Sequence, residues 1–434
     1  MRARPGSPAD EASVLLPSIT GSPAARFWML AIQAFFVGML VVPTVFQLQR
    51  GAVLAVLVGI AALLALSRWR VHRQIHFLWL ATTAVGAFGI TLGLVNDAPG
   101  ALRVSTVYLI WPALYLLFIG LCHGLPVIRR LESALLLGIS LATATALTVL
   151  AAELLGLGDV VYPLLAFQDA GFGAYDGLIE FRVINLTTVM YGFPFVVALL
   201  LARRRELRGW QKTWLWLLVA LMAVVAMGSG RRMFWLVVLL TPFLTLFFLR
   251  LSARRLRAVA MLGTLTRVAV VAALAATGVI VAFGLQPIAL VQEFVSAFLG
   301  QEGSSGIRFE QAGALWRAFE SSPLIGIGLG STVDSVYRQG WAFELWYLSL
   351  LKSVGLLGFL AYAVVVGWIV VKGMLLARRN REFAALFVPL VTAMMSFLIM
   401  TATNPYLGKF DYLWVIFLPV ALINAYLTKR SANA

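Results

Sequence analysis

The sequence alternates long apolar runs with short polar links along almost its whole length. About twelve of the runs are long enough to cross a hydrocarbon layer of about 30 Å as α-helices. They lack the apolar–polar alternation of strands in a membrane β-barrel, so helices are the expected structure. The pattern therefore predicts an all-α polytopic membrane protein. The runs are 27–47, 51–67, 76–95, 104–123, 131–155, 183–202, 213–229, 233–249, 261–283, 345–371, 383–403 and 410–428.

The polar segments divide the chain into five parts. The first 25 residues are rich in Pro, Ser and Ala, which is typical of a disordered tail. The largest polar segment separates the ninth apolar run from the tenth, and a smaller one follows the fifth run at 156–182. We expect a disordered tail over 1–25, membrane helices 1–9 over 26–284, an external loop over 285–343, membrane helices 10–12 over 344–428, and a short tail over 429–434.

Composition and charge support a membrane protein and set its orientation. Hydrophobic residues make up 61% of the chain and charged residues only 12%, which is outside the range of soluble domains. The net charge of +16 arises mainly from arginines in alternate links, as the positive-inside rule predicts if both termini are cytoplasmic. We therefore expect no nucleic-acid partner. The single cysteine, Cys122, excludes an intramolecular disulfide and cysteine-based metal sites.

The external loop begins with two predicted helices. Apolar residues recur at helical spacing over Pro287–Gly300, which predicts an amphipathic helix on the outer membrane surface. The spacing predicts a second helix over 307–321, ending there because Pro323 disfavours helical backbone at the residue before it. On this helix Arg308 shares one face with Gln311, and Arg317 lies on the other face.

Three glycines, Gly326, Gly328 and Gly330, follow the second helix. Their GxGxG spacing matches neither the Rossmann nor the P-loop pattern, and no strand–turn–helix unit surrounds it. We interpret the segment as a compact turn that folds the loop back onto the membrane domain, in preference to a phosphate-binding loop.

A candidate catalytic carboxylate stands at the start of the tenth apolar run. The stretch 341–371 would be about 45 Å long as one helix, so its first two turns are expected to protrude from the membrane. Glu344 would then lie at the outer mouth, on one stripe with Tyr347. A carboxylate at a partly dry mouth can act as a general base. An ion pair between Glu344 and a nearby arginine is an equally good interpretation.

Several arginines are expected on the external side, against the positive-inside bias. For Arg50 and Arg103 we favour contacts with lipid phosphates or with nearby acidic residues. Arg231 and Arg232 differ, because they follow a Gly-Ser-Gly sequence in a link too short for a solvated loop. Guanidinium groups beside exposed backbone amides suit an anion, most naturally a phosphate or diphosphate. The full set is Arg50, Arg103, Arg182, Arg231, Arg232, Arg308, Arg317 and Arg338.

Three motifs resemble the O-antigen polymerase and ligase superfamily of bacterial membrane glycosyltransferases. They are SGIRFEQAGALWRAFESSPLIGIGLGS in the large loop, YLSLLKSVGLLG in the tenth run and GSGRR between the seventh and eighth runs. The resemblance implies a GT-C-like fold in the bacterial inner membrane, with the 285–343 loop in the periplasm. It also implies donor and acceptor glycans carried on undecaprenyl diphosphate, and it allows a chain-length regulator protein as a partner.

The resemblance also implies roles for individual residues. Glu344 would be the general base, and Arg231 and Arg308 would stabilise the leaving diphosphate. We expect no cofactor and no metal, since the three histidines lie at or near the cytoplasmic side. The implied substrate-binding residues are Arg182, Arg232, Arg317, Arg338 and Tyr347.

Within the superfamily, the residues favour a polymerase over a ligase. The ligase branch opens its tenth helix with a His-Asn pair, whereas this chain has Glu344 and Leu345 at those positions. Arg317 and Gly328 also match the arginine-x10-glycine spacing of some polymerases. O-antigen ligase, with lipid A core as the acceptor, is the alternative. A twelve-helix transporter is less favoured, because the two halves show no internal repeat and a carrier has little use for the long external loop.

Overall fold

The structure is a computed structural model that describes residues 23–122, 124–175, 178–252, 258–284, 288, 303–333 and 343–432. It is 82% helical, which confirms the all-α class. The helices of the first half are α1 (Pro23–Val41), α2 (Gln47–Arg68), α3 (Arg73–Val95), α4 (Ala101–Ser105), α5 (Trp111–Leu121), α6 (Leu125–Leu154) and α7 (Gly158–Leu164). Those of the second half are α8 (Leu186–Ala202), α9 (Gly209–Gly228), α10 (Arg232–Leu251), α11 (Ala258–Ala282), α13 (Gly303–Ser321), α14 (Trp346–Arg379), α15 (Arg381–Thr401) and α16 (Trp414–Ala432).

Among the described residues, eight helices are long and apolar enough to cross a membrane. Four further apolar helices are shorter, and they begin near Arg26, Leu186, Thr266 and Trp414. Together these helices coincide with the twelve apolar runs of the sequence. The chain is therefore built as a multi-pass membrane protein, and the number of crossings stays a prediction.

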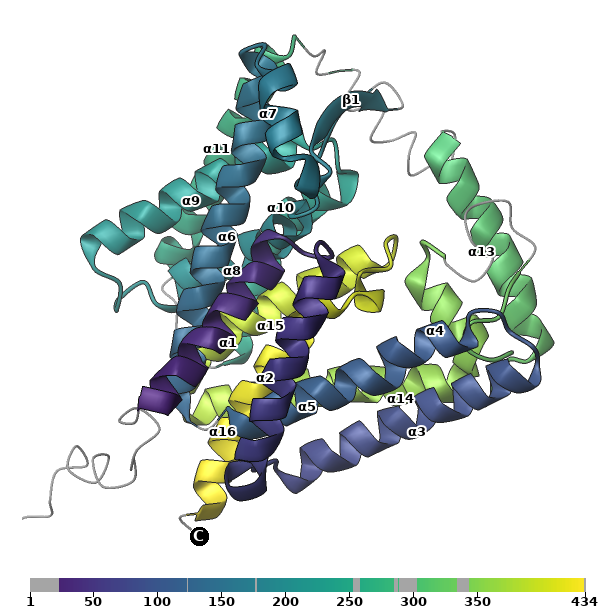
Figure 1. The fold of residues 1–434 in the computed structure, drawn as a ribbon. Helices are drawn as coiled ribbons and strands as arrows, with labels where there is room; N and C mark the ends of the chain where they lie inside the picture. Colours follow the sequence, from purple (N-terminus) through teal and green to yellow (C-terminus); the bar gives the residue numbers. More distant parts are fainter. Residues whose placement is uncertain are drawn as a thin grey trace, which may run out of the picture.

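Helices α8 and α15 form the centre of the bundle. Every residue of α8 is buried, and α8 packs along α15, which is also buried around most of its circumference. A helix that is apolar on all sides is expected at the centre of a membrane bundle, where it has no polar face to present. In Figure 1 the helices diverge around this centre, with α6 and α7 extending toward the top and α3 and α14 toward the right.

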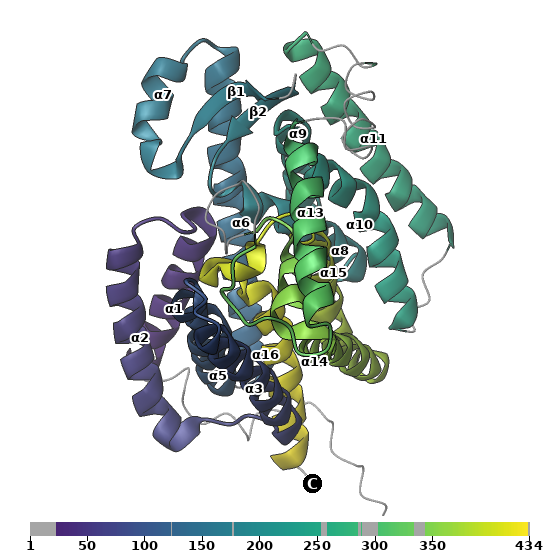
Figure 2. The same cartoon turned by 90° about the vertical axis from the view of Figure 1, so that its right-hand side faces the viewer.

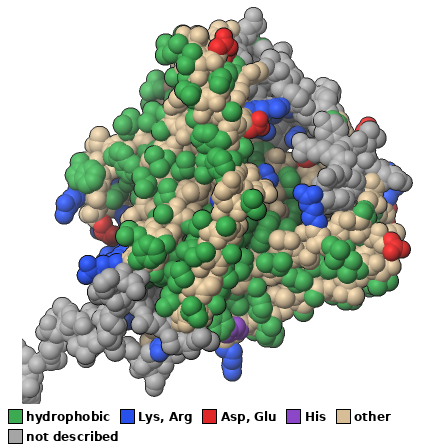
Figure 3. All heavy atoms as spheres, in the orientation of Figure 1, with side chains coloured by type: hydrophobic (Ala, Val, Ile, Leu, Met, Phe, Trp, Pro, Cys, Tyr) green, Lys and Arg blue, Asp and Glu red, His purple; other side chains and the backbone are tan. Residues whose placement is uncertain are grey.

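The outer surface is consistent with a membrane environment. Charged side chains gather mainly toward the lower left and the upper right in Figure 3, and the band between them is largely hydrophobic. Many large apolar side chains of α2, α3, α10 and α14 are exposed on the outside of the bundle. In lipid such exposure costs nothing, whereas in water it would promote aggregation.

Helix boundaries differ from the sequence prediction at several places. Helix α1 ends at Val41, six residues early, since Pro43 interrupts helical backbone. The predicted 1–25 tail is too long, because α1 already begins at Pro23; the remainder lies outside the described residues. The 429–434 tail is also too long, since α16 continues to Ala432, and 433–434 lie outside the described residues.

The 156–182 loop contains the one sheet of the described chain. Strands β1 (Gly171–Tyr175) and β2 (Leu178–Arg182) pair antiparallel, with Gly171 opposite Arg182. The sequence analysis missed this hairpin. The short 3-10 helix η3 (Ala166–Gln168) precedes it, and Gln168 fixes the loop by donating from Nε2 to the carbonyl of Val41, at 2.8 Å. Figure 2 shows the hairpin and α7 standing together beyond the end of α6.

Helix α14 is broken near its start, contrary to the prediction of one long helix. Gly355 has φ +65° and ψ −174°, so the helical ladder is interrupted there. The segment 323–328 replaces the missing hydrogen bonds with its own backbone. The bonds run from Ile327 N to Lys352 O (3.0 Å), Gly328 N to Ser353 O (3.0 Å), Leu356 N to Pro323 O (2.8 Å) and Leu357 N to Leu324 O (3.1 Å).

The glycine-rich segment folds back onto the membrane domain, as predicted. Gly326, Gly328 and Gly330 all have positive φ. A Cβ at Gly326 would lie 2.4 Å from the backbone of Ser353, and one at Gly328 would lie 2.4 Å from the backbone nitrogen of Gly93. Only glycine permits this approach, so the segment is a packing element between α3 and α14.

Candidate functional site

An ion pair between Arg308 and Glu344 forms the centre of the site. Arg308 lies near the start of α13, and Glu344 precedes α14. The Nε atom of Arg308 donates to Oε2 of Glu344 at 2.9 Å. The side chains are 32% and 21% exposed, so the pair is partly open to its surroundings. The structure thus confirms that Glu344 forms an ion pair with a nearby arginine. The role of Glu344 as a general base stays a proposal.

Helix α13 also holds the backbone of Glu344. Gln311, one turn along α13 from Arg308, is only 2% exposed, and its Oε1 accepts from the backbone nitrogen of Glu344 at 3.2 Å. The predicted stripe of Glu344 and Tyr347 on one helix is wrong, because α14 begins at Trp346 and Glu344 stands before it. Its carboxylate is therefore positioned by α13. Figure 2 shows α13 in front of α14, and the two helices pack together.

Two aromatic residues fix the beginning of α14. The hydroxyl of Tyr347 donates to the carbonyl of Leu398 in α15 at 2.5 Å. The ring of Trp346 stacks on Tyr108, with ring centroids 6.4 Å apart and an interplanar angle of 7°. Tyr347 thus acts as an anchor for the helix start in this structure, which leaves its predicted contact with substrate as a proposal.

Lys352 lies buried one and a half turns further along α14, and the sequence analysis did not select it. Its side chain is 1% exposed, its Nζ donates to the carbonyl of Ser331 at 2.7 Å, and the ammonium group lies 4.9 Å from the ring centre of Phe343. Phe343 immediately precedes Glu344. Lys352 therefore ties the glycine-rich segment to the residue before the carboxylate. A lysine within an apolar run was the available signal, since such residues are rarely without a role.

Tyr406 joins three of the predicted residues. It lies in a short 3-10 helix, η4 (Tyr406–Gly408), between α15 and α16. Burial raises the pKa of its phenol, the cations of Arg231 and Arg308 lower the pKa, and the carboxylate of Glu344 raises it. All three predicted catalytic side chains therefore lie within electrostatic reach of one hydroxyl. The sequence analysis missed Tyr406, although it lies in the polar stretch TNPYLGKFDY between the last two apolar runs.

Arg231 and Arg232 lie where α9 turns into α10. Gly230 has φ +65°, and the buried Ser229 accepts a hydrogen bond from the backbone of Arg231 at 3.2 Å. Arg231 is the N-cap residue with an exposed side chain, and Arg232 is the half-buried first residue of α10. A helix N-terminus carries partial positive charge that adds to that of the arginines. The arrangement is suited to an anion.

The remaining predicted arginines are not brought into this cluster. Arg182 ends strand β2 with an exposed side chain. Arg317 is also exposed, and its guanidinium lies back along α13 toward Gly313. Nine residues separate Arg317 from Arg308, which places them on opposite faces of the helix. Arg338 lies outside the described residues, as does the predicted amphipathic helix of Pro287–Gly300 except Ile288.

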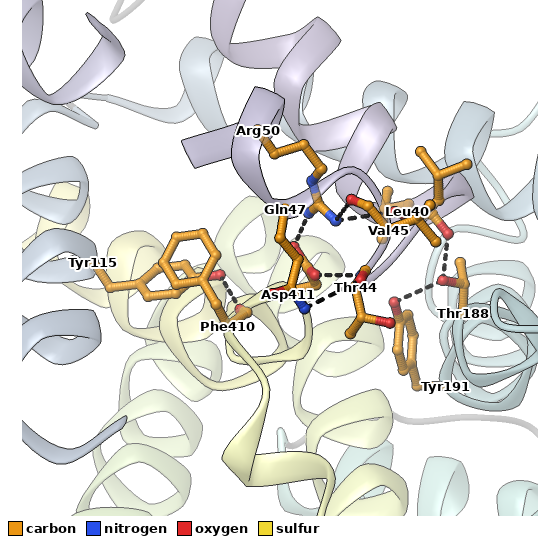
Figure 4. A network of polar contacts seen from close by, with 11 residues as sticks. Leu40, Thr44, Val45, Gln47, Arg50, Tyr115, Thr188, Tyr191, Phe410 and Asp411 are labelled. Carbon is orange, nitrogen blue, oxygen red and sulfur yellow. Dashed lines mark hydrogen bonds and ion pairs between the residues drawn. The ribbon is translucent and has the colours of Figure 1, made fainter. Parts of the chain in front are cut away.

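Arg50 forms a buried ion pair with Asp411, which confirms the interpretation of Arg50 as a partner of a nearby acid. Asp411 lies in the 3-10 helix η5 (Phe410–Tyr412), immediately after η4. The other carboxylate oxygen accepts from the backbone of Thr44 at 2.7 Å, and Arg50 also donates to the carbonyl of Val42 at 3.0 Å (Figure 4). This network fixes the segment that carries Tyr406.

The site offers a carboxylate, two arginines and a phenol, contributed by four separate segments. Such a set can accept a proton and stabilise a developing negative charge on phosphate. Within the described part of the chain, no three His, Cys, Asp or Glu residues gather in a way that could hold a metal ion. No known family model matches this sequence, and no curated protein is significantly similar to it.

Proposed function

We propose that this protein is a membrane glycosyltransferase that polymerises oligosaccharide repeat units carried on undecaprenyl diphosphate. The chain would cross the bacterial inner membrane twelve times with both termini in the cytoplasm. The end carrying α13, Glu344 and Tyr406 would face the periplasm. The observation that carries the proposal is the Arg308–Glu344 pair, which shares the surroundings of Tyr406 with Arg231.

In the proposed reaction, Glu344 takes the proton from a hydroxyl of the acceptor sugar. The hydroxyl oxygen forms a bond to the anomeric carbon of the donor, and the bond from that carbon to the diphosphate breaks. The electron pair of the broken bond leaves with undecaprenyl diphosphate. Arg231 and Arg308 stabilise the charge that develops there, a task for which preorganised cations are effective.

The geometry of the ion pair suggests how the base becomes available. The structure gives one hydrogen bond between the two side chains, through Nε and Oε2. Arg308 therefore occupies Oε2 of Glu344 before substrate binds. A donor diphosphate competes for Arg308, since arginine forks bind phosphate strongly. Once Arg308 turns to the diphosphate, Oε2 of Glu344 can accept a hydrogen bond from the acceptor hydroxyl, so deprotonation of the acceptor awaits the donor.

The other predicted residues would contribute binding rather than chemistry. Arg232 would extend the diphosphate site beside Arg231. Arg182, Arg317 and Arg338 would contact glycan or lipid diphosphate at the periphery, and Tyr347 would contact the sugar nearest to Glu344. The transfer would need no metal ion or cofactor, so EDTA should leave the activity of the purified enzyme unchanged. A chain-length regulator would bind on the periplasmic side.

The test is complementation of a deletion strain with wild type, Glu344→Gln or Arg231→Ala at matched expression. Glu310→Gln is the control, because Glu310 is exposed on the same helix as Arg308. We expect wild type and the control to restore a ladder of surface polysaccharide, and both site variants to give a single-repeat band. Long lipid-linked polymer without transfer to lipid A core would indicate a ligase instead. An unchanged ladder in both site variants would rule out the proposed site.

A further inference from the structure

A cavity lies between α3 and α14, at the end of these helices remote from Glu344. It has a volume of about 460 Å³ and is lined by Arg73, Gln74, Phe77, Leu78 and Trp368. Arg73 begins α3, whose far end contacts the glycine-rich segment through Asn96. The 23 residues of α3 span about 34 Å. The cavity therefore lies at the opposite end of α3 from the glycine-rich segment.

The lining surface is almost wholly apolar, and Arg73 is the one cation among the lining residues. On α3, Arg73 and Gln74 stand at the first turn, and Phe77 and Leu78 lie one turn deeper. On α14, which runs in the opposite direction, Trp368 lies one turn deeper than Lys372. Tryptophan is enriched at the boundary between headgroups and hydrocarbon. On each helix a cation therefore lies about one turn beyond the apolar lining residues, and the cavity is open to the outside, since Phe77 is 70% exposed.

The two cations lie around the same mouth. His72, which caps α3, has a lowered pKa, first because it is partly buried and then because Lys372 and Arg73 lie near it. The imidazole is therefore neutral at physiological pH and adds no third positive charge beside Arg73 and Lys372. The charged groups that act on His72 are both positive, so the mouth has a local excess of positive charge. An anion at this position would relieve that excess.

We infer that this cavity binds an anionic phospholipid of the surrounding bilayer, with the phosphate between Arg73 and Lys372 and an acyl chain over Phe77, Leu78 and Trp368. The volume lies in the range of ligand sites, about 300–1,000 Å³. Basic pockets between membrane helices are suited to anionic headgroups on the cytoplasmic side, where the predicted topology places this end. The inference depends on the membrane assignment and not on the proposed enzymatic activity.

The first experiment measures lipid binding by the purified full-length protein in phosphatidylcholine nanodiscs. Phosphatidylglycerol with brominated acyl chains is introduced, and tryptophan quenching is followed. Trp368→Phe identifies the contribution of Trp368. We expect brominated phosphatidylglycerol to quench the Trp368 component at a lower mole fraction than brominated phosphatidylcholine does. In the Arg73→Ala/Lys372→Ala double variant, the same quenching should require at least a tenfold higher mole fraction of brominated phosphatidylglycerol.

The control is the Arg204→Ala/Arg205→Ala double variant, which removes two exposed cations from the link after α8. It should bind phosphatidylglycerol like the wild type. Equal quenching by both lipids, or no change on removing Arg73 and Lys372, would overturn the inference. If undecaprenyl phosphate protects Trp368 from quenching better than unbrominated phosphatidylglycerol does, the inference would also be overturned. The cavity would then be assigned to the carrier lipid. None of these outcomes depends on glycan transfer.

Discussion

Arg50–Asp411 and Arg308–Glu344 are both arginine–carboxylate pairs that join segments far apart in the sequence, but their surroundings differ. Asp411 is 8% exposed and Arg50 18%, whereas Glu344 and Arg308 are 21% and 32% exposed. In the first pair both carboxylate oxygens accept hydrogen bonds, and the guanidinium also reaches backbone carbonyls. In the second, the described residues provide a hydrogen bond to one carboxylate oxygen, Oε2 of Glu344.

The comparison suggests how to distinguish a structural ion pair from a functional one. In a buried pair whose hydrogen-bonding groups are satisfied within the protein, no group is available to bind a ligand. Removing one partner leaves the other as an unpaired buried charge. A half-exposed pair with one bond contributes little to stability and can exchange partners. We therefore assign Arg50–Asp411 to holding the fold and Arg308–Glu344 to binding and chemistry. The following substitutions test that division.

Glu344→Gln should have the largest effect. The amide keeps the shape of the side chain but cannot accept the proton of the acceptor hydroxyl, so the rate of polymer formation should fall about 10²- to 10⁴-fold. Thermal unfolding should change little, because a half-exposed pair contributes about 0–1 kcal/mol. The measurements are single-turnover transfer between lipid-linked repeats and the melting temperature of the same preparation. A large loss of stability with normal transfer would reverse the assignment.

Asp411→Asn should show the opposite behaviour. It leaves Arg50 without its buried anionic partner, which typically costs about 3–5 kcal/mol of unfolding free energy. We expect a clear fall in the melting temperature in detergent, while the protein that remains folded transfers glycan at a rate close to wild type. Arg129→Ala is the control, because its pair with Glu382 is about half exposed and should be dispensable. Wild-type thermal stability of Asp411→Asn would contradict the structural role.

Arg308→Lys should have an intermediate effect. Lysine keeps the positive charge but loses the planar fork that binds phosphate with two parallel bonds. A hydrogen bond to a charged group contributes about 1.5–3 kcal/mol, and we expect kcat/KM for the donor to fall by about tenfold or more, through a lower kcat as well as a higher KM, because Arg308 would both bind the diphosphate and stabilise the charge that develops on it. The KM for the acceptor should be unaffected. Equal increases in both KM values would indicate a general disturbance of α13 and argue against a specific role at the diphosphate.

The apolar pattern was sufficient to predict the helices, but not the positions where they break. Periodicity and length report burial in lipid, and each of the twelve predicted runs contains a helix in the structure. Gly355 breaks α14 because the segment 323–328 supplies replacement hydrogen bonds, and no local pattern encodes a partner about 30 residues away. Likewise, Tyr406 joins Arg231 and Glu344 only through the tertiary fold. Arg308 and Glu344 could be selected from sequence because charge in an apolar chain is rare enough to be informative.

Tyr406→Phe should have the smallest effect and tests whether the phenol supports the charged groups or titrates itself. Burial and the nearby carboxylate of Glu344 raise the pKa of Tyr406 against the opposing effect of the two arginines, so the hydroxyl stays protonated throughout the range in which the enzyme would work. Loss of one neutral hydrogen bond, about 0.5–1.5 kcal/mol, corresponds to a two- to tenfold fall in rate. Because the phenol does not titrate, the pH–rate profile from pH 5 to 9 should keep its shape and fall uniformly. Disappearance of one limb of the profile in Tyr406→Phe would instead identify the phenol as a proton-transfer group, and Glu344 would then be left with the binding role alone.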